Sequence, residues 1–105
     1  MTRAGRFEVA TQGNTQVVDI TAQVVRVVDE ARIRQGILVV FVVGSTAALT
    51  TTEAEPGLVT HDLKAFFERI APENEYYKHE ATWNDDNGHA HVRALRGPLP
   101  HVPFL

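Results

Sequence analysis

Histidine is the residue type in this sequence whose spacing could support chemistry. Four of the five histidines lie between His79 and His101, and His89 and His91 flank a single alanine. On a β-strand, residues i and i+2 point to the same face, so a strand here would present two imidazoles side by side. That pair suits two nitrogen ligands of zinc or a similar divalent ion, with His79 as a third. The same pattern also occurs on solvated strand edges, so a metal site and a plain surface strand are both open.

Polar side chains surround the histidine triplet. Asp85, Asp86 and Asn87 precede it, and Glu53 lies further upstream. Asp85 or Asp86 could take the place of His79 as the third metal ligand. Asp85, Asp86 and Asn87 could also hold an imidazole in one tautomer or act as bases, and Glu53 could orient a histidine. A polar turn before a strand would have the same composition, and Glu53 could equally face water.

One apolar run is expected to position these groups. Ile37 to Val43 is unbroken and rich in β-branched residues, which is typical of a strand covered on both faces. Gly44, Ser45 and Thr46 follow it directly. Small residues at the end of a buried strand leave backbone N–H groups and hydroxyls free, so Ser45 and Thr46 are candidate substrate-binding residues.

The remaining elements follow from periodicity and turn residues. In chain order we expect strands at 7–11 and 16–20, a helix after Thr21 that stops near Gly36, an extended segment at 47–53, a helix from Leu58 to Ile70, a functional loop at 72–88, a strand at 89–96, a turn at 97–98 and an apolar end at 102–105. Short turns between neighbouring strands favour an α+β fold with a largely antiparallel sheet carrying two helices.

Composition excludes several classes of protein. A chain of 105 residues with 44% hydrophobic content indicates a single domain over residues 1–105. The net charge of −3, without a basic cluster, indicates neither nucleic acid nor membrane as a partner. There is no cysteine, secretion signal, phosphate-binding loop or nucleophile elbow, so a cytoplasmic protein is the default expectation.

Several segments, taken together and in order, resemble a known family. They are GILVVFVVGSTAALTTTEAEPGLVTHDL, then Tyr77-Lys78-His79, then WNDDNGHAHVRA and a Gly-Pro turn. From about Val17 to Phe104 the sequence resembles the YjbQ-type family of small proteins, also known as secondary thiamine-phosphate synthases. The resemblance implies an α+β fold of two packed, mostly antiparallel β-sheets with two helices, assembled as a homotrimer. It also implies a weak activity that joins the pyrimidine and thiazole phosphate halves of thiamine.

The resemblance further implies which residues form the site. His79 matches the loop histidine of the family, His91 the strand histidine, Glu53 the acidic residue after the central strand, and Asn87 the amide before the last histidine. A further family histidine is replaced by Gly44, which has no side chain to ligate a metal or move a proton. His89 could partly replace it.

Two further departures concern the late part of the chain. Between His91 and Gly97 the sequence is one residue shorter than the family pattern, which would reverse the face of each later side chain in a strand. The family pattern also continues beyond Leu105, so we expect the last strands to be missing.

Three functions are consistent with these features. The first is a YjbQ-like enzyme, thiamine-phosphate synthase-like, that joins or cleaves a small phosphorylated substrate at a histidine-rich site. The second is a catalytically inactive, trimer-forming module, favoured by Gly44. The third is a metal-dependent hydrolase, which rests only on the imidazole cluster.

Overall fold

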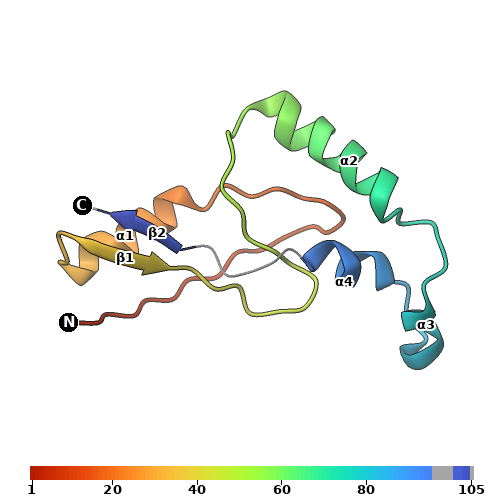
Figure 1. Ribbon diagram of the computed structural model, residues 1–105, viewed down its shortest axis with the longest axis horizontal. Helices are drawn as coiled ribbons and strands as arrows, with labels where there is room; N and C mark the ends of the chain where they lie inside the picture. The colour runs from red at the N-terminus through yellow and green to blue at the C-terminus, as the bar shows by residue number, and fades with distance from the viewer. Residues whose placement is uncertain (96–100, 105) are drawn as a thin grey trace.

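The computed structural model describes residues 1–95 and, for the backbone only, residues 101–104. The elements in chain order are α1 (Thr21–Ala31), β1 (Gly36–Val39), the π-helix η1 (Leu58–Asp62), α2 (Leu63–Ile70), α3 (Lys78–Trp83), α4 (Gly88–Ala94) and β2 (His101–Phe104). Figure 1 shows α1, β1 and β2 gathered at one end of the molecule and α3 and α4 at the other. The predicted turn at 97–98 lies outside the described residues.

The sheet of the described residues has two strands. β1 pairs antiparallel with β2, so that Gly36 lies opposite Phe104 and Val39 opposite His101. Helices and an antiparallel sheet in one chain confirm the predicted α+β class.

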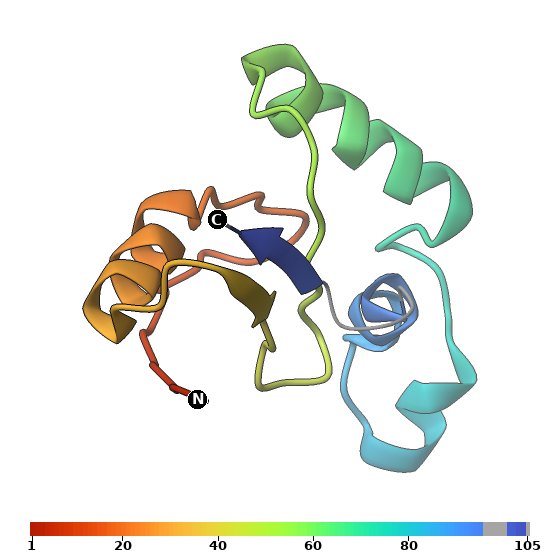
Figure 2. The same cartoon turned by 60° about the vertical axis from the view of Figure 1, so that its left-hand side comes forward.

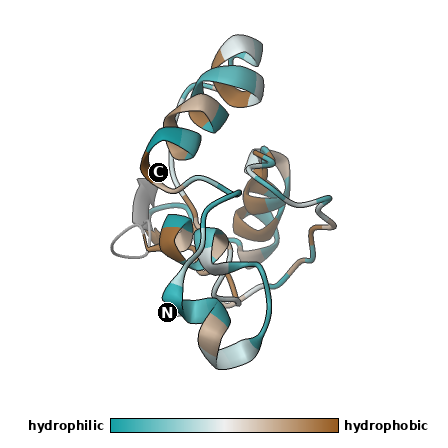
Figure 3. Ribbon diagram, turned by 90° about the vertical axis from the view of Figure 1, so that its right-hand side faces the viewer, coloured by the Kyte–Doolittle hydropathy of each residue, from teal (hydrophilic) through white to brown (hydrophobic). Residues whose placement is uncertain are grey.

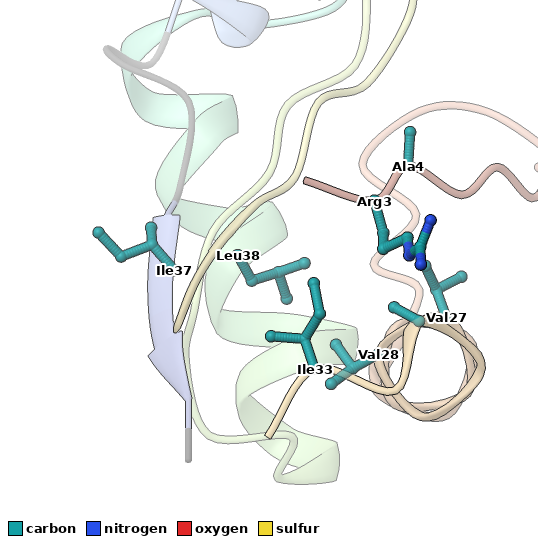
Figure 4. A pocket seen from close by; sticks show the side chains of 8 residues that line it. Arg3, Ala4, Val27, Val28, Ile33, Ile37 and Leu38 are labelled. Atoms are coloured by element: carbon teal, nitrogen blue, oxygen red, sulfur yellow. The ribbon is translucent and has the colours of Figure 1, made fainter. Parts of the chain in front are cut away.

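The central strand is shorter and more exposed than its sequence predicts. The ladder ends at Val39 rather than Val43, and residues alternate between exposed and half-buried along it. In Figure 4, Leu38 points toward Val28 of α1 and toward Ile33, whereas Ile37 points to the other side of the strand. The expectation of a strand covered on both faces is therefore wrong within the described residues, because α1 covers only one face.

The first helix confirms its predicted place but not its predicted cap. Asp19 Oδ1 accepts hydrogen bonds from the backbone N–H of Thr21 at 2.9 Å and from its hydroxyl at 2.6 Å. The Thr21 hydroxyl therefore donates to Asp19 instead of capping the helix. These bonds, the one from the hydroxyl above all, hold the pKa of Asp19 below its ordinary value. The helix ends at Ala31 and not near Gly36, and Arg32, which follows it, has left-handed geometry with φ 55°.

Three predicted strands do not form in the described part of the chain. Residues 7–11, 16–20 and 47–53 have no strand partner there. A strand needs a hydrogen-bonded neighbour for its N–H and C=O groups, and no backbone ladder joins these residues to another described segment. The two packed sheets that the resemblance implied are thus not present among residues 1–95 and 101–104, which contain a single two-stranded sheet.

The second helix begins where the sequence predicts. Glu55 Oε1 accepts from the backbone N–H of Gly57, and its Oε2 from that of Leu58, both at 2.8 Å. The carboxylate thereby satisfies two backbone donors that a helix start leaves without partners. The chain then continues through η1 into α2, which ends at Ile70 before Pro72.

The late part of the chain is helical where we expected a loop and a strand. Residues 78–83 of the expected loop form α3, and most of the predicted strand at 89–96 forms α4. Figure 2 shows these two short helices following one another below α2. Neither is long, so their positions depend on contacts with each other and with α2.

Few side chains are buried. Of residues 1–95, only Ala71, Gly88 and His89 fall in the buried class. The accessible surface is 8547 Å², against roughly 5,800 Å² for a folded monomer of this mass. The radius of gyration is 16.1 Å, against about 13 Å for a chain of this length folded around one core. Figure 3 shows hydrophobic and hydrophilic residues alternating along α1 and α2, so each of these two helices has apolar residues to cover.

No helix of the described residues is long and apolar enough to cross a lipid bilayer.

Candidate functional site

Two helices bring His79 and His91 together. His79 lies in the first turn of α3 and His91 in the second half of α4. Their ring centroids are 4.3 Å apart and the ring planes are inclined by 49°. Two imidazoles in van der Waals contact can hold a neutral and a protonated ring next to one substrate atom, which suits paired acid and base catalysis.

Asp85 and Asn87 lie beside this pair. Asp85 Oδ1 is 3.6 Å from His79 Nε2, an ion-pair distance when the ring is protonated and too long for a direct hydrogen bond. Oriented with its nitrogen toward Asp85, the Asn87 amide donates to the carboxylate at 3.0 Å and 3.2 Å. The amide therefore fixes the carboxylate that faces His79. Both residues were predicted to support the histidines.

His89 is separated from the other two histidines by the geometry of α4. Residues i and i+2 of an α-helix point about 200° apart, so His89 and His91 occupy opposite sides. His91 contacts His79, while His89 is 92% buried and its Nδ1 has no hydrogen-bond partner among the described atoms. The expectation that His89 and His91 share one face is wrong because it assumed a strand.

The predicted metal ligands are His79, His89 and His91. Residues 1–95 contain no group of three histidine, aspartate or glutamate side chains placed to hold one ion. The orphan Nδ1 of His89 is a ligand-capable atom, but it belongs to the other face of α4. These side chains do not fit a three-ligand centre as they stand, so no step proposed below passes through a metal. The zinc binding predicted from the sequence is tested by the metal content of the purified protein.

The carboxylate of Glu80 joins the starts of α3 and α4. Its Oε2 accepts from the backbone N–H of Tyr77 at 2.5 Å, and its Oε1 from that of Gly88 at 2.9 Å. Glu80 was not among the residues predicted from the sequence to form the site. A signal was present, because a glutamate three residues after the residue that precedes a helix is the position of a capping-box acid.

Arg93 attaches α4 to the rest of the molecule. Its Nε donates to the carbonyl oxygen of Ala71 at 2.9 Å, its Nη1 to Asn14 Oδ1 at 2.9 Å and to the Thr15 hydroxyl, and its Nη2 to Glu68 Oε1 at 2.7 Å. Only 9% of its side chain is exposed. No local pattern in the sequence marks Arg93, since all of these partners are distant along the chain.

Tyr77 connects the start of α3 to the segment that follows α2. Its hydroxyl donates to the carbonyl oxygen of Pro72 at 2.7 Å, and burial raises the pKa of this phenol above its ordinary value. Its neighbours Tyr76 and Trp83 are about 70% exposed. Tyr77 is therefore structural, while the other two aromatic rings are exposed.

The other predicted site residues are not joined to the histidines. Gly44, Ser45, Thr46, Glu53 and Asp86 are all exposed, and no hydrogen bond or ion pair within the described ranges connects them to His79 or His91. Gly44 has φ 143°, a conformation that favours glycine, so a histidine there would be strained in this backbone. The roles of Ser45, Thr46, Glu53 and Asp86 stay predictions.

Comparison with known proteins gives a consistent result. The family model described as "UPF0047 protein YjbQ-like" matches residues 5–101. A UPF0047 protein of Archaeoglobus fulgidus is 36% identical over 94 residues, which cover 89% of this chain and 70% of the relative. A UPF0047 protein of Methanothermobacter thermautotrophicus is 35% identical over 96 residues, 90% of this chain and 65% of the relative.

A third relative, UPF0047 protein MJ1081 of Methanocaldococcus jannaschii, is 27% identical over 85% of this chain. The match covers 62% of that relative, so the chain spans somewhat less than two thirds of its length. Because the family model covers nearly the whole chain, the chain belongs to the YjbQ-like UPF0047 family.

Proposed function

We propose that this chain is a YjbQ-type enzyme that uses the imidazoles of His79 and His91 as a paired acid and base on a small phosphorylated substrate. The observation that carries the proposal is the 4.3 Å separation of the two rings, which come from different helices. Asp85 supports it, since its carboxylate faces His79 Nε2 and can orient that ring.

The substrate class follows from the family resemblance. In a thiamine-phosphate synthase-like reaction, the nitrogen of a thiazole phosphate attacks the methylene carbon of an activated pyrimidine. A C–N bond forms, the C–O bond to the phosphate leaving group breaks, and that group departs with the electron pair. A protonated imidazole of the pair can donate its proton to the leaving oxygen, and the neutral ring can accept a hydrogen bond from the substrate.

The remaining predicted residues would bind and orient this substrate. Asn87 holds Asp85 in place. Ser45, Thr46 and Asp86 offer exposed hydroxyl and carboxylate groups, and Glu53 an exposed carboxylate. For Ser45, Thr46 and Glu53 to contribute, the segment 44–53 of the same or a neighbouring copy has to reach the histidine pair.

Assembly as a homotrimer is part of the proposal. The exposed area exceeds that of a typical monomer by more than 2,000 Å², which is in the range that permanent subunit interfaces bury. Pairing between copies would also give the extended segments 7–11, 16–20 and 47–53 strand partners and so complete the two packed sheets that the resemblance implies.

Substitution of each histidine tests the enzyme proposal. The reaction to measure is formation of thiamine phosphate from its pyrimidine and thiazole phosphate halves. We expect His79→Gln and His91→Gln to lower kcat/KM by a factor of about 100 or more. His61→Gln is the matched control, because the His61 side chain is 80% exposed. Equal activity in all four proteins would contradict the proposed site.

A catalytically inactive, trimer-forming module is the second candidate, and Gly44 favours it. The positive φ of Gly44 suits glycine. Because glycine has no side chain, the imidazole that the family site has at this position is missing. A parent protein that assembles normally but turns over no phosphorylated substrate would support this candidate over the enzyme.

A further inference from the structure

We infer that Glu80 is the positioning residue of the His79–His91 pair, and this inference rests on the proposed function of that pair. Glu80 follows His79 directly in α3. Its two carboxylate oxygens accept from the backbone N–H groups of Tyr77, before α3, and Gly88, the first residue of α4. One side chain thus holds the beginnings of the two helices that carry the two imidazoles.

The spacing along α4 explains how this contact reaches His91. His91 lies three residues after Gly88, close to one helical turn, so its place relative to α3 depends on where α4 begins. The bond between Glu80 and Gly88 closes the segment 81–87, which contains Asp85 and Asn87. Glu80 therefore also determines where the carboxylate beside His79 lies.

The close approach at Gly88 supports the same role. A Cβ added to Gly88 would lie 2.5 Å from Glu80 Oε1 and 2.5 Å from the Cβ of Tyr77. Real Cβ atoms do not come so close, so any other residue would push α4 away from α3. Glycine at this position lets the backbone N–H reach the carboxylate.

Each oxygen of Glu80 accepts from a different backbone N–H group. Both oxygens must therefore be acceptors if the side chain is to hold the two helix starts together. In Glu80→Gln one oxygen becomes an amide nitrogen, which cannot accept from a backbone N–H. One of the two helix starts then loses its acceptor, although the size of the side chain is unchanged. The two rings should move apart while the fold is retained.

The test is an NMR measurement that does not depend on activity. In the parent protein, the ring protons of His79 and His91 should show a mutual nuclear Overhauser effect. We expect this signal to be lost in Glu80→Gln and in Gly88→Ala, and retained in Glu75→Gln, an exposed carboxylate three residues before Lys78. A signal unchanged in Glu80→Gln and Gly88→Ala would overturn the inference, as would global unfolding of both under conditions where Glu75→Gln is folded.

Kinetics separate this inference from the proposed function. If both hold, Glu80→Gln lowers kcat by about tenfold to a hundredfold, and adding Glu80→Gln to His79→Gln causes little further loss, because Glu80 acts through the histidines. Full additivity of the two losses would overturn a positioning role. Loss of the ring signal in Glu80→Gln, together with a parent protein that has no activity, would retain the inference and reject the proposed function.

Discussion

The guanidinium of Arg93 donates to Glu68 Oε1 over 2.7 Å and thereby joins α4 to α2 across 25 residues of sequence. The same side chain reaches the carbonyl of Ala71 and the side chain of Asn14. With so few buried side chains in the described chain, this hydrogen-bonded centre is the main connection between the histidine-bearing helices and the rest of the molecule.

Replacing Arg93 should therefore destabilise the fold. Arg93→Met leaves the Ala71 carbonyl and the Asn14 amide oxygen without their donor, each worth roughly 1–3 kcal/mol when buried and unsatisfied. We expect the free energy of unfolding to fall by at least about 2 kcal/mol in urea titrations. Arg26→Met, at an exposed position of α1, is the control and should change it by less than about 0.5 kcal/mol. Equal effects of the two substitutions would show that the Arg93 contacts do not stabilise the protein.

The contribution of Glu68 should depend on pH. The hydrogen bond from Arg93, and secondly the one from the backbone N–H of Glu73, lower the pKa of Glu68 below its ordinary value of 4.5. A carboxyl whose pKa is lower in the folded state stabilises the fold above the unfolded pKa, and loses that effect as the pH falls through the folded pKa. The parent should thus be more stable than Glu68→Gln at pH 7, and this advantage should shrink below pH 4.5. A stability difference that is constant from pH 7 to pH 3 would contradict this assignment.

Sequence reasoning succeeded where a local pattern was sufficient. The helices at 21–31 and from Leu58 are marked by apolar periodicity. His79 and His91, both predicted as site residues, lie in contact, while their role in a site stays a prediction. It failed at residues 89–96, where the alternation of histidine and alanine suggested a strand. Gly88 receives its hydrogen-bond acceptor from Glu80, so α4 begins through a contact with α3 that the local sequence does not indicate.

The same wrong strand prediction led us to expect His89 beside His91. A strand would have placed His89 beside His91, whereas the helix turns it into the interior, and the predicted metal ligands were divided between two faces. Arg93 was missed for a related reason. Its acceptors Ala71, Glu68 and Asn14 are far away in sequence, and no pattern in the sequence indicates that they contact Arg93.

The metal content of the purified protein tests the predicted ligand set. Because His89 lies on the other face of α4 from His91, we expect well below one zinc per chain after purification without an affinity tag. The measurement is elemental analysis of the parent beside a His89→Ala, His91→Ala double variant. One metal per chain that disappears in the variant would contradict this expectation and support the metal-dependent hydrolase.

Exposed apolar side chains in and just after β1 allow a test of assembly. Ile37 and Val39 of β1, and Phe41 and Val43 just after it, occur at every second residue and are 60–82% exposed. We refer to these four side chains as the apolar row. Burying a side chain of this kind contributes about 1.5–3 kcal/mol, which a subunit interface would gain at each position. Light scattering should give three times the chain mass of 11.6 kDa for the parent and a smaller mass for Phe41→Asp. Val25→Asp, at an exposed apolar position of α1 outside the row, is the control and should remain assembled. A parent that is monomeric, or a Phe41→Asp variant of unchanged mass, would exclude this row as the interface.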